Sequence, residues 1–227
     1  MAGHSYNQFC PIAKACEILE PRWTLLILCE MWSGSSRFNE IRRGVPGMSP
    51  TLFSKRLKEL EAKGIIARQA VPGSTQHNYI ITAIGNELGP IVFALGQWAH
   101  KHVEAEVTLE CLDAGLLMWN MRRNIDCTAI KTSKTVIQFI LSEGHSTTEN
   151  YWLIVKSGCD VDLCMKDPGF DVDLYVKADL KALTSVWMGL SELQHEIKQQ
   201  KIVLLGNHQL AQSIDRWMIR SQFAKKA

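Results

Sequence analysis

The stretch MSPTLFSKRLKELEAKGII, residues 48–66, carries the start and stop signals of a single helix. The Ser49 side chain can accept hydrogen bonds from the free backbone amides of a first helical turn, and Pro50 suits the first helical position because its missing N–H has no partner there. Gly64 can adopt the left-handed conformation that ends many helices. The sequence therefore predicts a helix that begins at Ser49 and ends at Gly64.

The same stretch separates its apolar side chains from its polar ones. Phe53, Leu57 and Leu60 recur at the spacing of one helical face, which predicts that they are buried. The opposite face carries polar and basic side chains, namely Thr51, Ser54, Lys55 and Lys58. A helix of this kind packs one face on a core and presents a basic face outward.

The flanking segments predict a helix-turn-helix followed by a β-hairpin. Upstream, a shorter helix with three arginines leads through a turn at residues 44–47 into the long helix. Downstream, residues 65–71 and 77–81 predict two strands around the turn signal at residues 72–74. The first part of the chain is therefore expected to be a winged helix-turn-helix.

Residues 82–102 predict one long helix with an apolar stripe, which Pro90 should kink because it removes a backbone hydrogen bond. So long a stripe at the end of a small domain needs a partner. The first helix of the chain, a second copy of the chain, or both can supply it.

Charge is unevenly distributed along the chain. The whole sequence has a formal net charge of +2, but residues 37–68 hold eight Lys and Arg against three Asp and Glu. A local basic surface suits phosphate groups, because each neutralised phosphate releases counterions. Charge alone is equally compatible with an ordinary solvated helix face.

From residue 105 onward the pattern changes from helices to alternating strands. Strands are expected at residues 135–141, 151–155, 161–165 and 172–176, before two helices, a last strand and a terminal helix. The expected fold class is α+β. Residues 1–104 form the winged helix-turn-helix domain, and residues 105–227 form a second domain with a mainly antiparallel sheet covered by helices.

The runs CPIAKACEILEPRWTLLIL, RFNEIRRGVPGMSPTLFSKRLKELEAKGII and LGQWAHKH resemble the HxlR-type winged helix-turn-helix regulators of bacteria, over about residues 8–103. The resemblance implies a homodimer that binds double-stranded DNA through the helix that begins at Ser49. The side chains it implicates in DNA contact are Arg37, Arg42, Arg43, Ser49, Thr51, Ser54, Lys55, Arg56, Lys58, Gln76 and His77. The wing, VPGSTQHNY, carries no Lys or Arg, so strong minor-groove contact is not expected.

The run VDLYVKADLKALTSVWMGL, together with KIVLLGNHQLAQSI, is similar to the sterol-carrier-protein-like fold, over about residues 110–220. In that fold a sheet and helices enclose a lipid-sized apolar tunnel, so the resemblance implies that an apolar small molecule or lipid binds there. The expected lining consists of Trp119, Phe139, Trp152, Trp187, Met188 and Leu190. The alternative is that these six side chains simply pack a core.

The seven cysteines are odd in number and widely spaced, with no CxxC pair. This pattern favours neither a disulfide framework nor a structural metal, and it suits a reducing cytoplasm. Cys10 stands directly before the first helix, where many HxlR-type regulators place a reactive cysteine, and a helix N-terminus lowers the pKa of a thiol. Cys10 is therefore a candidate redox sensor, or else a half-buried small residue.

Motifs for catalysis, cofactor binding or membrane insertion are absent from the sequence. It contains no HExxH, GxGxxG, GxSxG or phosphate-binding loop, and its seven histidines are scattered. No enzymatic activity, cofactor or metal site is expected. There is neither a secretion leader nor a run of about 20 apolar residues, so a cytoplasmic protein without a membrane partner is expected.

Three functions remain open at this stage. The first is a DNA-binding transcriptional regulator whose second domain binds an apolar molecule that modulates DNA binding. The second is a lipid carrier or scaffold in which the winged helix serves dimerisation only. The third is a regulator that senses oxidants through Cys10, with the second domain as a structural addition. A steep salt dependence of operator binding separates the first from the second.

Overall fold

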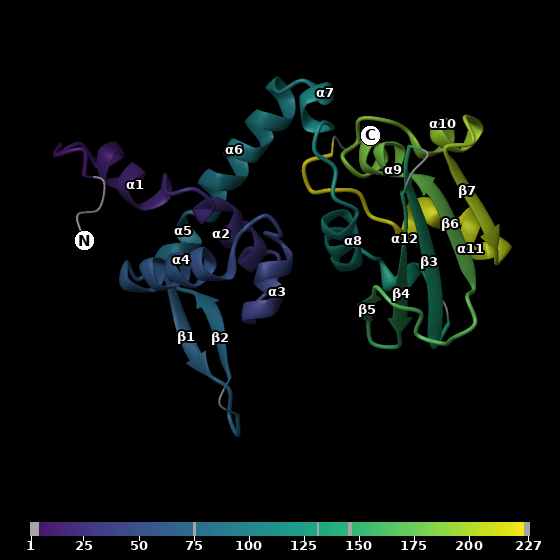
Figure 1. Cartoon of the computed structure of the whole chain (residues 1–227), viewed down its shortest axis with the longest axis horizontal. Coiled ribbons are helices and arrows are strands. Elements are labelled where there is room, and N and C mark those ends of the chain that lie inside the picture. The colour runs from purple at the N-terminus through teal and green to yellow at the C-terminus, as the bar shows by residue number, and fades with distance from the viewer. Residues whose placement is uncertain (1–4, 75, 131, 145–146, 225–227) are drawn as a thin grey trace. The chain divides into compact units, whose positions relative to one another are not determined.

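The computed structural model describes residues 5–74, 76–130, 132–144 and 147–224. The chain divides into two compact units, Met1–Trp98 and Ala99–Ala227, which are described separately below (Figure 1). Both units combine helices with strands, so the expected α+β class is confirmed at this level. Among the described residues, no helix has both the length and the apolar character needed to cross a membrane.

The first unit is a set of helices with a two-stranded hairpin. Its elements are α1 (Pro11–Leu19), α2 (Thr24–Trp32), α3 (Phe38–Arg43), α4 (Pro50–Ala62), β1 (Ile66–Ala70), β2 (His77–Ile81), α5 (Ala83–Glu87) and α6 (Gly89–His102). One apolar core joins α2, α3, α4 and β1, and its most deeply buried members are Ile27, Leu28, Ile41, Val45, Phe53, Leu57 and Ile66. Helices α2 to α4 with the hairpin form the expected winged helix-turn-helix.

Helix α4 begins and ends where its sequence predicts. Ser49 Oγ accepts a hydrogen bond from the Leu52 amide at 3.3 Å. At the other end, Gly64 has a φ of 70°, and the Ile65 amide donates to the Leu60 carbonyl at 3.0 Å. This bond and the left-handed glycine are the Schellman closure of a helix.

The wing is tied to the segment that precedes α3. Strands β1 and β2 pair in antiparallel fashion. The Tyr79 amide of β2 donates to the Ser36 carbonyl at 2.7 Å, and Arg37 forms an isolated β-bridge with Asn78. The hairpin therefore has a short third edge that connects it to the helix-turn-helix.

The long helix expected over residues 82–102 is two helices, α5 and α6, separated at Leu88. The expected kink at Pro90 was wrong. Pro90 lies in the first turn of α6, where its missing N–H costs no helical hydrogen bond, so it begins a helix. Gly85 in α5 is required by close packing, because a Cβ there would overlap the Ile65 carbonyl oxygen.

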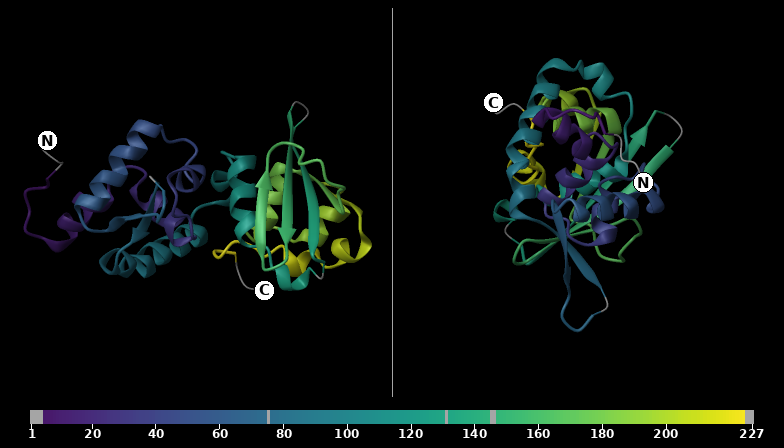
Figure 2. Two further views of the ribbon diagram at one scale, coloured as in Figure 1. Left: turned by 90° about the horizontal axis from the view of Figure 1, so that it is seen from below. Right: turned by 90° about the vertical axis from the view of Figure 1, so that its left-hand side faces the viewer.

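The second unit is a five-stranded sheet with helices packed on one face (Figure 2). Its elements are α7 (Ala105–Thr108), α8 (Ala114–Arg123), η1 (Cys127–Ala129), β3 (Lys134–Glu143), β4 (Thr147–Lys156), β5 (Asp160–Cys164), β6 (Leu174–Asp179), α9 (Leu180–Trp187), α10 (Leu193–Lys198), β7 (Ile202–Gly206), α11 (His208–Gln212) and α12 (Ile214–Trp217). The strand order is β5-β4-β3-β6-β7, in which β3 and β6 are parallel and the other neighbours are antiparallel. The sheet is thus mainly antiparallel, as expected.

Alternation along β3 decides which side chains face the helices. Ile137, Phe139 and Leu141 are buried in a core that they share with α8, α9 and α12. The intervening Gln138 and Ile140 point to the opposite face and are only partly buried. The helix side chains that belong to this core lie on the first face, and among the described residues no helix covers the second face at β6 and β7, where Tyr175, Val203 and Leu205 are exposed.

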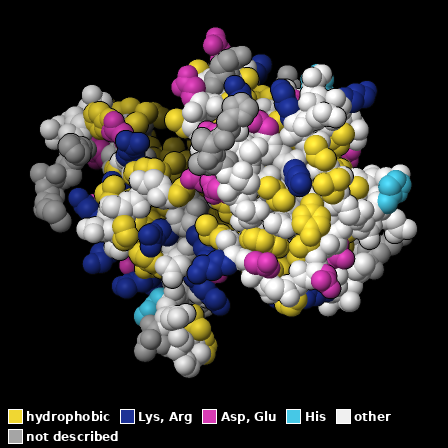
Figure 3. All heavy atoms as spheres, turned by 45° about the vertical axis from the view of Figure 1, so that its right-hand side comes forward, with side chains coloured by type: hydrophobic (Ala, Val, Ile, Leu, Met, Phe, Trp, Pro, Cys, Tyr) yellow, Lys and Arg dark blue, Asp and Glu magenta, His cyan; other side chains and the backbone are white. Residues whose placement is uncertain are grey.

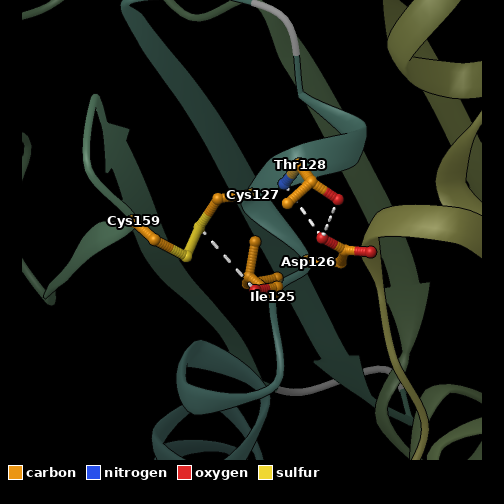
Figure 4. The surroundings of a disulfide bond; sticks show 5 residues. All are labelled: Ile125, Asp126, Cys127, Thr128 and Cys159. Carbon is orange, nitrogen blue, oxygen red and sulfur yellow. Dashed lines mark hydrogen bonds between the residues drawn. A yellow bond between two sulfur atoms is a disulfide. The ribbon is translucent and has the colours of Figure 1, made fainter.

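A disulfide joins Cys127 in η1 to Cys159 in the turn between β4 and β5 (Figure 4). Asp126 caps η1 by accepting hydrogen bonds from the Thr128 amide and hydroxyl at 2.9 and 2.6 Å. The expectation that the cysteines form no disulfide framework is corrected for this pair. The two residues lie 32 positions apart, and only the folded sheet brings them together.

Candidate nucleic-acid interface

The outward side of α4 is a polar stripe. Thr51, Lys55 and Lys58 are exposed, whereas Phe53 and Leu57 on the opposite side are buried. Residues spaced at i, i+4 and i+7 lie along one side of a helix. The three polar side chains therefore extend from α4 in the same direction.

Beneath this stripe lie packed aromatic rings and a buried acid. The Phe38 ring of α3 meets the Phe53 ring of α4 edge-on, with 4.7 Å between the ring centroids. Buried Glu30 of α2 accepts a hydrogen bond from the Ser35 hydroxyl at 2.6 Å. Its carboxylate also lies so close to the backbone at Gly44 that a Cβ there would overlap it. The buried Glu30 carboxylate thus packs against the backbone at the start of the turn between α3 and α4.

Ion pairs on α4 distinguish its basic side chains. Glu59 pairs with Arg56, whose side chain is 13% exposed, and lies 3.9 Å from Lys55. Arg56 therefore lies along the helix surface and is less available than the sequence predicted. Lys58 is exposed and forms no ion pair within the described parts of the chain. It is the α4 cation best placed to meet a phosphate group.

Helix α3 adds further positive charge beside α4. Arg37 precedes the helix, is exposed, and lies 3.9 Å from Glu40. Arg42 and Arg43 are exposed in the last turn, where cations also interact favourably with the helix dipole. Figure 3 shows Lys and Arg side chains gathered beside the hairpin of the first unit.

The remaining predicted contact residues differ in their availability. Ser49 is exposed but its hydroxyl caps α4, and Ser54 is only partly exposed. Gln76 and His77 are exposed at the start of β2. The predicted contact residues therefore form two groups, one on α3 and α4 and the other, Gln76 and His77, on the hairpin.

Two features were not predicted from the sequence: the exposed Lys63, and the hydrogen bond that joins the wing to Ser36. Lys63 is the exposed C-cap residue of α4, and its position in the basic segment between Arg37 and Arg68 could have identified it. The hydrogen bond from Tyr79 to Ser36 joins residues more than 40 positions apart, and no local pattern predicts it.

Cys10 occupies the N-cap position of α1 and is partly buried. The backbone amides of Ala13 and Ile12 lower the pKa of its thiol. Cys29 differs, because burial raises the pKa of its thiol. Among the described residues, no three His, Cys, Asp or Glu side chains are arranged to hold a metal ion.

The six side chains expected to line one apolar pocket do not converge. Phe139 pairs with Tyr151 across β3 and β4 and faces the helices. Trp152 pairs with Gln138 and faces the other side of the sheet. Since strand neighbours alternate in direction, Phe139 and Trp152 cannot line the same cavity. The expectation that all six side chains line a single pocket was therefore wrong.

The other four members of that set also occupy different environments. Trp187 is buried in the core, Met188 packs against that core, and Leu190 is exposed. Trp119 is buried, with the Arg122 guanidinium 4.1 Å from its ring centroid. Packing explains most of this set.

Comparison with known proteins gives consistent matches to the first part of the chain. The model of the HxlR-like helix-turn-helix family matches residues 18–107. YvaP, an uncharacterized HTH-type transcriptional regulator of Bacillus subtilis, is 36% identical over 100 residues, which cover 43% of this chain and 93% of YvaP. The HTH-type transcriptional regulator YodB of the same organism is 33% identical over 100 residues, which cover 43% of this chain and 89% of YodB.

Among solved structures, the redox regulator HypR in its oxidized form is 29% identical, with a TM-score of 0.40. The match covers 42% of this chain and 99% of HypR. The residues matched by the family model include α2 to α6 and both strands of the hairpin. They therefore contain the basic surface formed by Arg37, Arg42, Arg43, Lys55, Lys58 and Lys63.

Proposed function

Because this chain belongs to the HxlR-like helix-turn-helix family, we propose that it is a sequence-specific DNA-binding regulator of transcription that acts in the cytoplasm. The observation that carries the proposal is the exposed polar and basic stripe of α4, opposite the buried Phe53 and Leu57. Helix α4 acts as the recognition helix in the major groove. Thr51 and Lys55 are directed to base edges, and Lys58 with the α3 arginines is directed to phosphates.

We further propose that the protein binds DNA as a homodimer. The first unit leaves a row of large apolar side chains exposed along α5 and α6, namely Ile84, Ile91, Leu95 and Trp98. Phe9 and Ile12, next to and within α1, are exposed as well. An apolar surface of this extent favours burial against a second copy. Two recognition helices then read half-sites about 34 Å apart.

For the second unit we propose a ligand-binding role that modulates DNA binding. Two observations support it: the resemblance to sterol-carrier-like proteins and the helix-free face of the sheet. A ligand changes DNA affinity only if it prefers one dimer geometry over another. Helix α6 is suited to transmit such a preference, because it contains three of the four residues of the apolar row and the division between the units after Trp98.

A second candidate function is redox sensing through Cys10. The observation that favours it is the lowered pKa of the thiol at the N-terminus of α1. A larger thiolate fraction makes a cysteine a better target for oxidants and electrophiles. In this version a Cys10→Ser variant keeps its DNA affinity and loses its response to a hydroperoxide.

The proposed DNA binding is tested by selecting bound sequences from a random duplex pool with the full-length protein. We expect enrichment of an inverted repeat and an affinity that falls steeply with salt. A lipid carrier whose winged helix serves only dimerisation gives neither result. Absence of both enrichment and salt dependence therefore refutes the regulator.

The proposed dimer is tested by sedimentation of a Leu95→Glu variant. We expect it to become monomeric and to lose the paired half-site preference, because the charge cannot be desolvated in an apolar interface. A matched Lys198→Glu variant, altered on an exposed residue of the second unit, should remain dimeric. A dimer that survives Leu95→Glu shows that another surface is used.

A further inference from the structure

We infer that the helix-free face of the sheet holds a binding site for a small apolar carboxylate, centred on Lys177. The inference rests on the ligand-binding part of the proposed function and gives it a location and a ligand class. A hollow of about 370 Å³ on this face is lined by Ile140, Tyr175, Lys177, Leu205 and Gly206. This volume is near the lower end of the range of small-molecule sites, so it suits a single short chain and not a diacyl lipid.

The strand register brings the lining side chains to one face. Ile140 of β3 pairs with Lys177 of β6, and Tyr175 of β6 pairs with Leu205 of β7. Tyr175 and Lys177 are two residues apart on one strand, so they point in the same direction. The side chains at Tyr175 and Leu205 are 36% and 47% exposed. An accessible apolar surface therefore surrounds one basic group.

The connection from β5 to β6 packs at the Lys134 end of β3 and contributes no residue to the lining of the hollow. The Phe170 ring of this connection lies over Lys134, with 2.8 Å between Nζ and the ring centroid. Asp173 accepts a hydrogen bond from the Val136 amide at 2.8 Å. Figure 3 shows hydrophobic side chains gathered around a basic side chain on the second unit.

The positive charge of Lys177 determines which class of ligand suits the hollow. Lys177 is the only charged residue in the lining of the hollow, and it forms no ion pair within the described ranges. Its cross-strand neighbours are Ile140 and Val203, both apolar. A carboxylate can accept a hydrogen bond from Nζ while its chain covers Tyr175 and Leu205. A neutral apolar ligand would cover the ammonium group without pairing it, which is unfavourable.

A second copy of the same face fits less well. Around a two-fold axis through the hollow, Lys177 would approach its own counterpart, and two like charges would lose water together. A ligand with one negative end and an apolar chain avoids this cost. The charge pattern therefore points to a medium-chain carboxylate.

The experiment is a calorimetric titration of the full-length protein with decanoate, below the concentration at which it aggregates. We expect saturable binding of one decanoate per chain. Lys177→Met should weaken this binding about fivefold, as expected for an accessible ion pair, and Lys177→Arg should preserve it. Lys198→Met, which removes an exposed lysine elsewhere in the unit, should leave the affinity unchanged.

Two further measurements locate the ligand. Decanol should bind the native protein no more tightly than decanoate binds the Lys177→Met variant. Neither of these two complexes can form the ion pair between Lys177 and a carboxylate. Amide chemical shifts should change around Ile140, Tyr175 and Leu205. No saturable binding, equal affinity in Lys177→Met, or shifts confined to other elements would each overturn the inference. DNA binding is measured in parallel: its presence without decanoate binding refutes this site alone, whereas its absence refutes the regulator.

Discussion

Replacement of Lys58 by Ala should weaken DNA binding by the same factor on every sequence. Lys58 is exposed on α4 and has no competing ion pair among the described residues, so the whole charge is available to a phosphate. Each lost phosphate contact reduces the slope of log K against log salt by about 0.9. At 0.1 M salt this corresponds to about eightfold lower affinity per contact. A homodimer carries the change twice, which gives a slope change of about 1.8 and about sixtyfold lower affinity.

The assay is fluorescence anisotropy of a labelled duplex, titrated with protein at several salt concentrations between about 50 and 200 mM, the range in which phosphate contacts dominate. A selected operator and a scrambled duplex are measured side by side. Lys198→Ala serves as the matched control, because it removes the same charge from an exposed position outside the basic surface. An unchanged slope would refute the phosphate contact. A loss confined to the operator would instead assign Lys58 to a base.

The other predictions concern the support, the thiol and the disulfide. Phe53→Ala should lower the free energy of unfolding of the first unit by about 3 to 5 kcal/mol in urea denaturation, because it removes a buried ring that packs on Phe38; a loss below about 1 kcal/mol would contradict that packing. The lowered pKa of Cys10 keeps thiolate present at pH values where an ordinary thiol is protonated. Its alkylation by iodoacetamide should therefore show a midpoint below that of free cysteine, about pH 8.5, and a midpoint at or above it would refute the prediction. Cys127→Ser should destabilise the second unit by about 3 to 4 kcal/mol under oxidising conditions, since the bond to Cys159 closes a long loop. Reduction should destabilise the native protein by a similar amount and leave the variant unchanged, and equal stability before and after reduction would show that the bond contributes nothing.

The parts of the fold that were predicted correctly depend on local signals. The ends of α4 follow from Ser49 and Gly64, which act within one helical turn of their own positions. The hairpin follows from two strand-like runs around a turn. The prediction for Pro90 failed because the same residue can begin a helix or kink one, and the choice depends on where the preceding helix ends.

The parts that could not be predicted depend on contacts between distant segments. Alternation in β3 and β4 indicates two faces for each strand but not how the strands are paired. Only the register shows that Phe139 and Trp152 lie on opposite sides of the sheet. The same limit applies to the Cys127–Cys159 pair, which depends on the path of the two strands between them, β3 and β4. The candidate DNA-binding residues were easier to find because most of them belong to one helix and its neighbour.

Two accessible apolar surfaces among the described residues suit different partners for an electrostatic reason. Residues 89–98 of α6 include no charged residue, so a second copy can cover this helix without removing water from a charge. The hollow on the sheet face has Lys177 as the one charged residue of its lining, and covering it with a copy of itself would bring like charges together. The proposed dimer contact uses residues of the first unit, whereas the hollow belongs to the second unit and suits a ligand that supplies a negative charge. Because α6 also contains the division between the units, a ligand on the sheet alters DNA binding only as far as it favours one arrangement of α6 in the dimer. An uncharged helix surface therefore suits the proposed dimer contact, and a hollow lined by a single cation suits the proposed carboxylate.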